Sequence, residues 1–309
     1  MIDDVHCHFF SSSFLELLTR NMPGLPEPDR AAAVAARLGW ADPGSAEALS
    51  GVWVNELDRH AVSRASLIAS IPGDEDSVAE AVRLYPDRFV GFFMFNPLAP
   101  DASSRLERAL SQQKMRCVCL FPAMHEYAVN LETVGKVFEA AASHGAAVFV
   151  HCGVLTVGVR AKLGLPSSFN LRSGDPLAVA SVASAFPQVP VIIPHFGAGM
   201  FREALMAADQ CGNIHLDTSS SNSWMKYYPG LTLDTVFRQA LSVLGAQRIL
   251  FGTDSSFFPR GWQKGIYVVQ TAAMKTAGAS EADRQLMLGG NFERLFPRES
   301  VRITDGVDR

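Results

Sequence analysis

The sequence predicts a (β/α)8 (TIM) barrel with a helical insertion after its first strand, and three observations carry this prediction. Short runs rich in Val, Ile and Phe recur along the whole chain, stretches with helical periodicity separate them, and the runs number eight. Alternating strands and helices indicate βαβ units with a parallel sheet, and eight such units indicate that the sheet closes on itself. An open doubly wound sheet is the alternative, but no GxGxxG follows the first run.

The expected elements follow in order along the chain, and together they make one domain over residues 1–309. The predicted strands are Ile2–His8, Ala65–Ile71, Phe89–Phe95, Arg116–Phe121, Ala147–Cys152, Pro190–His195, Ile214–Thr218 and Arg248–Thr253. The amphipathic stretches between them are Glu75–Tyr85, Ser103–Gln113, Leu131–His144, Pro176–Phe186, Met200–Gln210 and Leu233–Leu244.

A long segment separates the first strand from the next clear helix, which lies near Trp53. It contains two helical pieces, Phe14–Asn21 and Arg30–Leu38, broken by several prolines. It is too short to bury a core of its own. We therefore interpret residues 10–52 as an insertion over the barrel mouth, the face on which barrel enzymes build their sites.

Composition narrows the class of protein. The net charge of -4 and the absence of a clustered basic stretch argue against a nucleic-acid partner. The N-terminal MIDDVHCHFF lacks the positive charge of a signal peptide, and no apolar run reaches membrane-spanning length. Five cysteines in a chain of this size favour a reducing compartment over a disulfide scaffold. We expect a cytoplasmic protein with no membrane partner. A homodimer is possible, because two-fold dimers are the commonest oligomers of soluble proteins.

The first strand ends in two histidines, His6 and His8. Side chains alternate along a strand, so both point the same way with Cα atoms about 6.6 Å apart. Two imidazoles at that separation can converge on one ion. Val5, Cys7 and Phe9 are then expected to face the helix-covered side. Taken alone, the pair is equally compatible with two histidines that have only a structural role at the end of a strand.

Three further strands end in residues that ligate metals. His151 ends the fifth strand, His195 the sixth and Asp254 the eighth. Each terminates an apolar run that would otherwise be buried, and burying such groups without a partner is costly. Because the carboxyl ends of barrel strands meet at one face, these side chains are expected to gather there.

The pattern resembles the amidohydrolase superfamily. VHCHFF, FVHCG, IIPHFGAG and FGTDSSF are similar to its amidohydrolase 2 branch, whose members include aminocarboxymuconate semialdehyde decarboxylase. The closing NFERLF also resembles that branch. The resemblance spans the whole chain, and its motifs do not specify a reaction.

The resemblance implies that His6, His8, His151 and Asp254 are metal ligands, and that His195 and Asp254 are catalytic. Two-metal members use a Lys or Glu near the end of strand four or five, and neither stands there in this chain. One divalent ion is therefore expected, Zn²⁺ first, with Mn, Fe or Co also suited to such ligands. Aromatic-acid decarboxylases of the branch often have Glu where this chain has His6. This difference argues against their substrate class but does not exclude decarboxylation.

A small-molecule substrate is expected, and long loops supply candidate contacts. Arg160 and Arg172 follow the fifth strand, Trp224 the seventh and Arg260 the eighth. An arginine at a barrel mouth can clamp a carboxylate, although each also fits a solvated loop charge, and the tryptophan also fits loop packing.

Three functions stay open. The first is a mononuclear metal-dependent hydrolase that uses activated water on a small carboxylate-bearing substrate. The second is a non-oxidative decarboxylase of an unsaturated or aromatic carboxylate. The third is a non-catalytic metal-binding barrel, which a ligand set rich in His and Asp disfavours.

Overall fold

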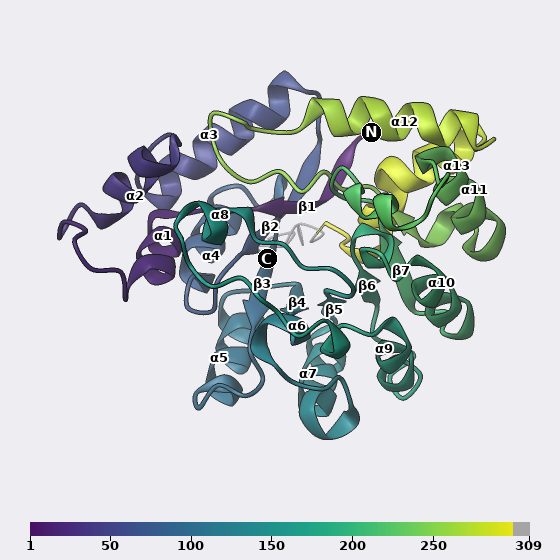
Figure 1. Cartoon of the computed structure of the whole chain (residues 1–309), viewed down its shortest axis with the longest axis horizontal. Helices are drawn as coiled ribbons and strands as arrows, with labels where there is room; N and C mark the ends of the chain where they lie inside the picture. The colour runs from purple at the N-terminus through teal and green to yellow at the C-terminus, as the bar shows by residue number, and fades with distance from the viewer. Residues whose placement is uncertain (299–309) are drawn as a thin grey trace, which may run out of the picture.

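The structure is a computed structural model that describes residues 1–298, so the last part of the predicted domain, 299–309, lies outside the described residues. Eight parallel strands form a barrel inside a ring of helices (Figure 1). The strands are β1 (Asp3–His8), β2 (Arg64–Ala69), β3 (Phe89–Phe95), β4 (Cys117–Leu120), β5 (Ala147–Val150), β6 (Val191–Ile193), β7 (Ile214–Asp217) and β8 (Ile249–Leu250). They pair in sequence order. The backbone of Asp254 donates to His6 O at 2.9 Å and that of His8 to Ser255 O at 2.7 Å, which closes the ring. The predicted fold class is confirmed.

Helices cover the outside of the barrel in the expected order. They are α3 (Ala46–Arg59), α4 (Glu75–Leu84), α5 (Ala102–Glu107), α7 (Leu131–His144), α9 (Pro176–Ala183), α10 (Phe201–Gln210), α11 (Leu233–Leu244) and α12 (Lys264–Thr276). Shorter helices are α1 (Ser12–Thr19), α2 (Arg30–Leu38), α6 (Pro122–His125), α8 (Gly158–Lys162), α13 (Glu281–Gln285) and α14 (Asn291–Leu295). The 3-10 turns are η2 (Leu171–Ser173), η3 (His195–Gly197), η4 (Ser223–Tyr227) and η5 (Ala246–Arg248). The π-helical segments are η1 (Arg108–Gln112) and η6 (Leu286–Gly290).

Helix α7 shows why sequence patterns located several elements well. Its N-cap Asn130 accepts a hydrogen bond from Thr133 N through its side chain, and Gly145 ends it in the left-handed conformation. Both residue types are the preferred ones at these positions. The predicted helix over 103–113 is instead split, because the backbone changes from α5 to the π-helical η1 at Arg108.

Two apolar layers hold the barrel, one inside the strands and one between strands and helices. Phe92 and Phe149 belong to the inner layer, and Cys7 and Phe9 to the outer one, as expected for the last two. The expectation for Val5 was wrong, because it packs in the inner layer. A register shift in β1 between Asp4 and Cys7 breaks the simple alternation of its side chains.

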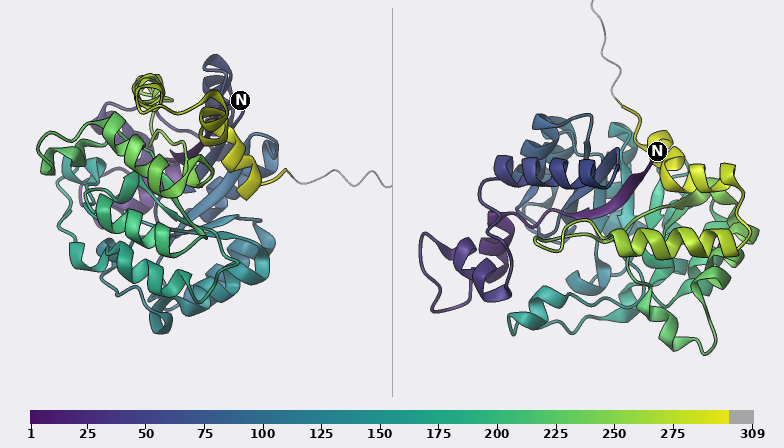
Figure 2. Two further views of the ribbon diagram at one scale, coloured as in Figure 1. Left: turned by 90° about the vertical axis from the view of Figure 1, so that its right-hand side faces the viewer. Right: turned by 90° about the horizontal axis from the view of Figure 1, so that it is seen from above.

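The segment after β1 holds α1, α2 and the start of α3. Helices α1 and α2 project from one side of the barrel, next to α8 (Figures 1 and 2). Phe14 of α1, Val34 of α2 and Val159 of α8 share a small apolar cluster separate from the barrel layers. Trp53 of α3, by contrast, is fully buried in the outer barrel layer. This side of the protein therefore carries a small cap made by α1, α2 and α8.

At the amino end of the strands, the barrel buries the carboxyl group of Asp3. Asp3 is 1 % exposed, and neither of its side-chain oxygens has a hydrogen-bond partner. Burial, reinforced by the charge of Glu293, raises the pKa of Asp3 to about 7. Arg64 lies nearby and donates to Phe296 O at 2.7 Å, which ties α14 to the barrel base.

We expect Asp3→Asn to change how stability depends on pH. A raised pKa in the folded state means that Asp3 favours folding below about pH 4 and loses that contribution as pH rises through 7. The variant lacks this loss, so its free energy of unfolding relative to wild type should rise by about 1–3 kcal/mol between pH 5 and pH 8. Urea unfolding at both pH values measures this. If the difference in unfolding free energy between the two proteins is the same at both pH values, the raised pKa of Asp3 is contradicted.

Within residues 1–298, no helix is long and apolar enough to cross a membrane.

Candidate metal centre

Three predicted ligands meet at the carboxyl ends of β1 and β8. His6 Nε2 lies 3.3 Å from His8 Nε2. Asp254 Oδ1 lies 3.1 Å from His8 Nε2 and 3.7 Å from His6 Nε2. A tetrahedral site with bonds of about 2.0–2.1 Å places its ligand atoms about 3.3 Å apart. These three atoms therefore have the spacing of one face of such a site.

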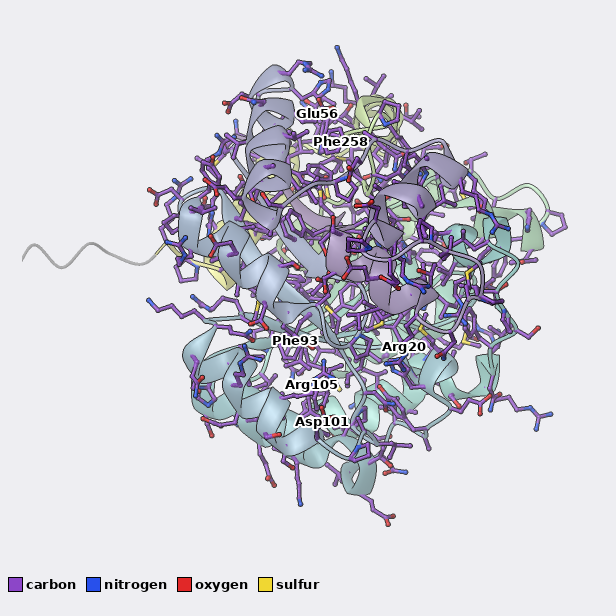
Figure 3. The ribbon with its side chains drawn as sticks, turned by 90° about the vertical axis from the view of Figure 1, so that its left-hand side faces the viewer. Arg20, Glu56, Phe93, Asp101, Arg105 and Phe258 are labelled. Carbon is purple, nitrogen blue, oxygen red and sulfur yellow. The ribbon has the colours of Figure 1, made fainter. Side chains whose placement is uncertain are left out.

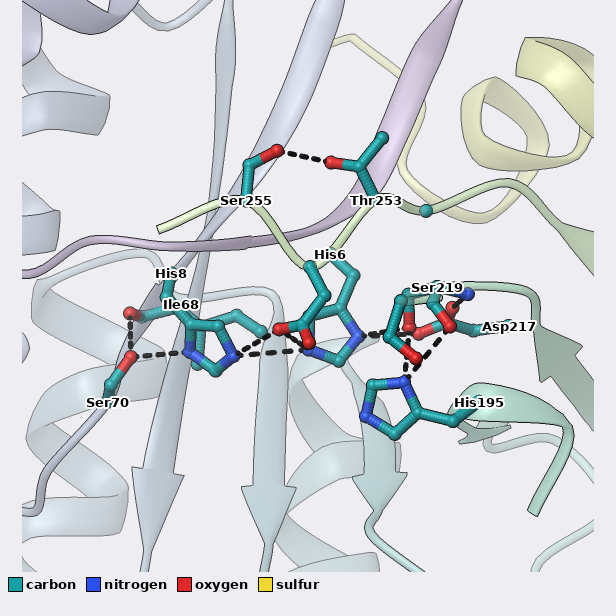
Figure 4. Close-up of polar contacts among 12 residues, drawn as sticks. His6, His8, Ile68, Ser70, His195, Asp217, Ser219, Thr253 and Ser255 are labelled. Atoms are coloured by element: carbon teal, nitrogen blue, oxygen red, sulfur yellow. Dashed lines mark hydrogen bonds and ion pairs between the residues drawn. The ribbon is translucent and has the colours of Figure 1, made fainter. Parts of the chain in front are cut away.

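The outer nitrogens of both histidines are held by hydrogen bonds (Figure 4). His6 Nδ1 lies 2.7 Å from Asp217 Oδ2, and His8 Nδ1 lies 2.7 Å from Ser70 Oγ. The carboxylate of Asp217 can only accept, and the Ser70 hydroxyl already donates to Ile68 O. We therefore assign the ring proton to Nδ1 in both histidines.

This assignment tests whether a cation fits the site. With the ring proton on Nδ1, the Nε2 atom of each histidine can present its lone pair on the side where the Asp254 carboxylate lies. These three ligand atoms, 3.1–3.7 Å apart, can then bind one divalent cation together. Imidazole nitrogen and carboxylate oxygen are also ordinary ligands for zinc and related ions. The residues present fit a metal.

The charges of the three groups are coupled. Burial opposes the charged ring of His6, but the Asp217 carboxylate outweighs it and raises the pKa of His6. Burial lowers the pKa of His8. Burial also opposes the charged form of Asp254, yet its contacts with His8 and His6 hold the pKa of this carboxyl below its usual range. Asp254 is therefore an anion at neutral pH.

His151 and His195 lie beside this group but outside the cluster of three. The His195 ring is centred 4.9 Å from that of His6 and 5.3 Å from that of His151. Burial, with the neighbouring His195 and His6, lowers the pKa of His151 well below its usual range. His151 Nδ1 is buried without a hydrogen-bond partner. A buried ring nitrogen without a partner calls for an explanation, and the role of His151 as a further ligand stays a prediction.

The backbone is strained where the site residues leave their strands. His195 has φ 55° and Asp254 has φ 61°, and Ser220 after β7 has φ 68°. A side chain in the left-handed region costs on the order of 1–3 kcal/mol, and such residues cluster at functional sites. The strain therefore lies at the ends of three neighbouring strands that face the candidate centre.

A cavity of about 520 Å³ opens above these residues. Two of the four predicted substrate contacts, Trp224 and Arg260, line it. Arg160 and Arg172 are not among the residues that line it. Arg160 donates to Pro166 O in its own loop, and Arg172 lies exposed in η2.

One wall of the cavity is aromatic. Phe10 stacks on Phe14 with ring centres 4.3 Å apart and on Trp40 at 5.5 Å, and Trp40 stacks on Phe257 at 4.3 Å. The guanidinium of Arg260 lies over the Phe257 ring at 5.3 Å and donates to Asp254 O at 2.9 Å. The aromatic wall thus continues to a cation placed beside the candidate centre.

The loop that carries Arg260 is tied down at its far end. Glu56 of α3 accepts a hydrogen bond from Trp262 N at 3.0 Å, and Glu56 and Phe258, both labelled in Figure 3, line the same small surface pocket. Trp262 Nε1 donates to Asp4 at 2.8 Å. These bonds hold the β8–α12 loop against both α3 and β1, which limits how far Arg260 can move.

Three residues that contact the two histidines were not predicted from the sequence. Asp217 ends β7 and Ser219 lies just after it, and both contact His6, while Ser70 follows β2 and contacts His8. Asp217 was available as an acidic residue at the end of a buried strand, as Asp254 was. Ser70 and Ser219 look like ordinary loop residues, because serine is common where strands end.

Comparison with known proteins agrees with this architecture. A family model described as "Amidohydrolase" matches residues 3–298. Among solved structures, a 5-carboxyvanillate decarboxylase from Sphingomonas paucimobilis has a TM-score of 0.64 at 17% identity, with 96% of this chain and 99% of that chain covered. A probable 2-pyrone-4,6-dicarboxylic acid hydrolase from Acinetobacter baumannii, with citric acid bound, has a TM-score of 0.58 at 15% identity, with 96% and 98% covered. At such identities the likeness shows the fold alone. No curated protein sequence matches the chain.

Proposed function

The chain belongs to the amidohydrolase family, and from that premise we propose that it is a mononuclear metal-dependent hydrolase of a small anionic substrate. The observation that carries the proposal is the cluster of His6, His8 and Asp254, whose ligand atoms all lie within 4.8 Å of one another. His151 completes the proposed ligand set. Zn²⁺ is the ion we propose, since imidazoles and a carboxylate suit it well.

A bound divalent ion would supply Lewis-acid polarisation and lower the pKa of a coordinated water to about 7. The protein supplies the rest. Asp254, an anion at neutral pH, can accept a proton at its carboxylate and return it to a leaving group. His195, whose pKa is lowered by burial and by His6, is neutral and can hold a substrate carbonyl or move a proton.

The charge of the cavity supports an anionic substrate. Lys162, Lys226 and Arg260 line it, and Asp254 is the only acidic residue among the described lining residues. The aromatic wall formed by Phe10, Phe14, Trp40 and Phe257 suits an apolar or flat portion of the same molecule. The substrate that fits best therefore has an apolar body and a carboxylate.

Decarboxylation on the same site is the second candidate. Arg260 favours it, because its guanidinium donates to the backbone of Asp254 and so lies within reach of a carboxylate near the proposed metal. A hydrolase would use the same arginine to hold a carboxylate that does not react. A substrate panel of lactones, amides and unsaturated carboxylates, scored for ring opening or CO2 release, separates the two reactions.

Metal content tests the proposal directly. Protein purified without added metal should carry about one equivalent per chain, and His6→Ala should carry almost none. His144→Ala, which alters an exposed histidine at the end of α7 next to Glu107, is the control and should keep its metal. Elemental analysis of the three proteins gives the answer. Wild type without metal, and with a melting temperature indifferent to added Zn²⁺ or Mn²⁺, would overturn the proposal.

A further inference from the structure

The end of β7 lies directly behind the candidate metal centre. Asp217 is fully buried, and its Oδ2 lies 2.7 Å from His6 Nδ1 while its Oδ1 accepts from Ser219 N at 2.5 Å. Ser219 Oγ lies 2.9 Å from His6 Nδ1 and 2.8 Å from His195 Nδ1 (Figure 4). Ser219 therefore joins the ring of a proposed ligand to that of a proposed catalytic residue.

Gly252 leaves the space in which His6, Asp217 and Ser219 come together. A Cβ atom at Gly252 would lie 2.9 Å from His6 Cβ, 3.0 Å from Asp217 Oδ1 and 3.0 Å from Ser219 Cβ. Contacts this short force neighbours apart, and all three of these neighbours belong to the same group. The glycine that precedes Thr253 and Asp254 therefore makes room for the contact between β1 and β7.

We propose that Asp217, Ser219 and Gly252 are positioning residues, which together fix the orientation of His6 and His195 toward the cavity. Asp217 keeps the ring proton of His6 on Nδ1, so that Nε2 presents its lone pair to His8 and Asp254. Ser219 bridges the two rings, and Gly252 allows their close packing. This inference rests on the metal site proposed above.

Asp217→Asn is the sharpest test, because the hydrogen bonds dictate how the new amide must lie. Ser219 N needs an acceptor, so the amide oxygen has to face it and the NH2 group has to face His6 Nδ1. That donor forces the His6 proton onto Nε2 and removes the lone pair for the metal. The Kd for Zn²⁺ alone, measured by competition with a chelator, should rise about 10–100-fold.

Gly252→Ala tests the packing without changing any polar group. Its added methyl should push His6 away from Asp217 and weaken Zn²⁺ binding at least about tenfold. Gly135→Ala is the matched control, because a Cβ at Gly135 of α7 meets nothing within 4 Å. This control should bind Zn²⁺ as wild type does.

Nitrogen NMR of wild-type protein labelled in histidine gives a reading that does not depend on whether a variant folds. In the zinc-loaded protein, His6 should keep its proton on Nδ1. A proton on Nε2 of His6, or equal Zn²⁺ affinity in wild type, Asp217→Asn and Gly252→Ala, would overturn this inference and leave the metal site standing. A wild type that binds no metal would overturn the proposed function and this inference together.

Discussion

Asp254→Asn should lower kcat/KM by between about 10²- and 10⁴-fold, the range for the loss of a positioned proton acceptor. The substitution preserves shape but removes the charge that lies 3.1 Å from His8 Nε2. Because contacts with His8 and His6 hold the pKa of Asp254 below its usual range, the group is ionised throughout the pH range of an assay. The activity should therefore fall at every pH, with no compensating shift of the profile.

Metal content must be measured alongside the rates, because Asp254 is proposed both as a ligand and as a proton carrier. A variant that keeps its metal and loses turnover separates the proton-transfer role from the ligand role. Asp209→Asn on the exposed side of α10 is the control for a lost surface carboxylate and should leave kcat/KM unchanged. Turnover by Asp254→Asn within tenfold of wild type would exclude Asp254 as the proton acceptor.

The barrel could be predicted because the apolar residues of its strands and helices follow clear periodic patterns. The strand over Phe89–Phe95 and the helices over Arg30–Leu38, Leu131–His144 and Leu233–Leu244 lie where the pattern places them. The prediction for Val5 failed, since a two-residue period cannot anticipate the register shift in β1. Strand pairing decides that detail, and pairing involves residues far apart in the chain.

The site was only partly predictable for the same reason. His6, His8 and Asp254 come together because the carboxyl ends of strands in a closed barrel must share one face. Asp217 lies 211 positions from His6, and no local pattern links the two. Contacts between the first and seventh strands become visible only once the register of every strand between them is known.

The charged residues of α8 show most clearly what the sequence could not predict, namely which loop side chains face the cavity. Arg160 and Lys162 lie two positions apart in α8, yet only the lysine lines the cavity. Val159 and Leu163 pack into the cap cluster with α1 and α2, which fixes how α8 is turned. The direction of a charged side chain in this loop is therefore set by apolar contacts with a segment more than a hundred residues earlier.

Gly153→Ala should be among the most destabilising single substitutions in the protein. Gly153 has φ 69°, and a Cβ atom there would overlap the carbonyl oxygens of Gly197 and Ala198. Those oxygens are backbone atoms, held in place because Val154 N donates to Ala198 O at 2.8 Å. The chain can relieve the overlap only by moving the end of β5 away from that of β6. We expect a loss of about 4 kcal/mol or more, as for other severe backbone conflicts.

Gly164→Ala separates the clash from the cost of the backbone conformation. Gly164 has a similar φ of 71°, but a Cβ there meets nothing within 4 Å, so only the left-handed strain of about 1–2 kcal/mol remains. Urea unfolding of wild type and both variants gives the comparison. The two strand ends that Gly153 joins carry His151 and His195, whose ring centres lie 5.3 Å apart. A folded Gly153→Ala protein should therefore also bind Zn²⁺ more weakly, whereas equal stability of the two variants would show that the β5–β6 contact is not closely packed.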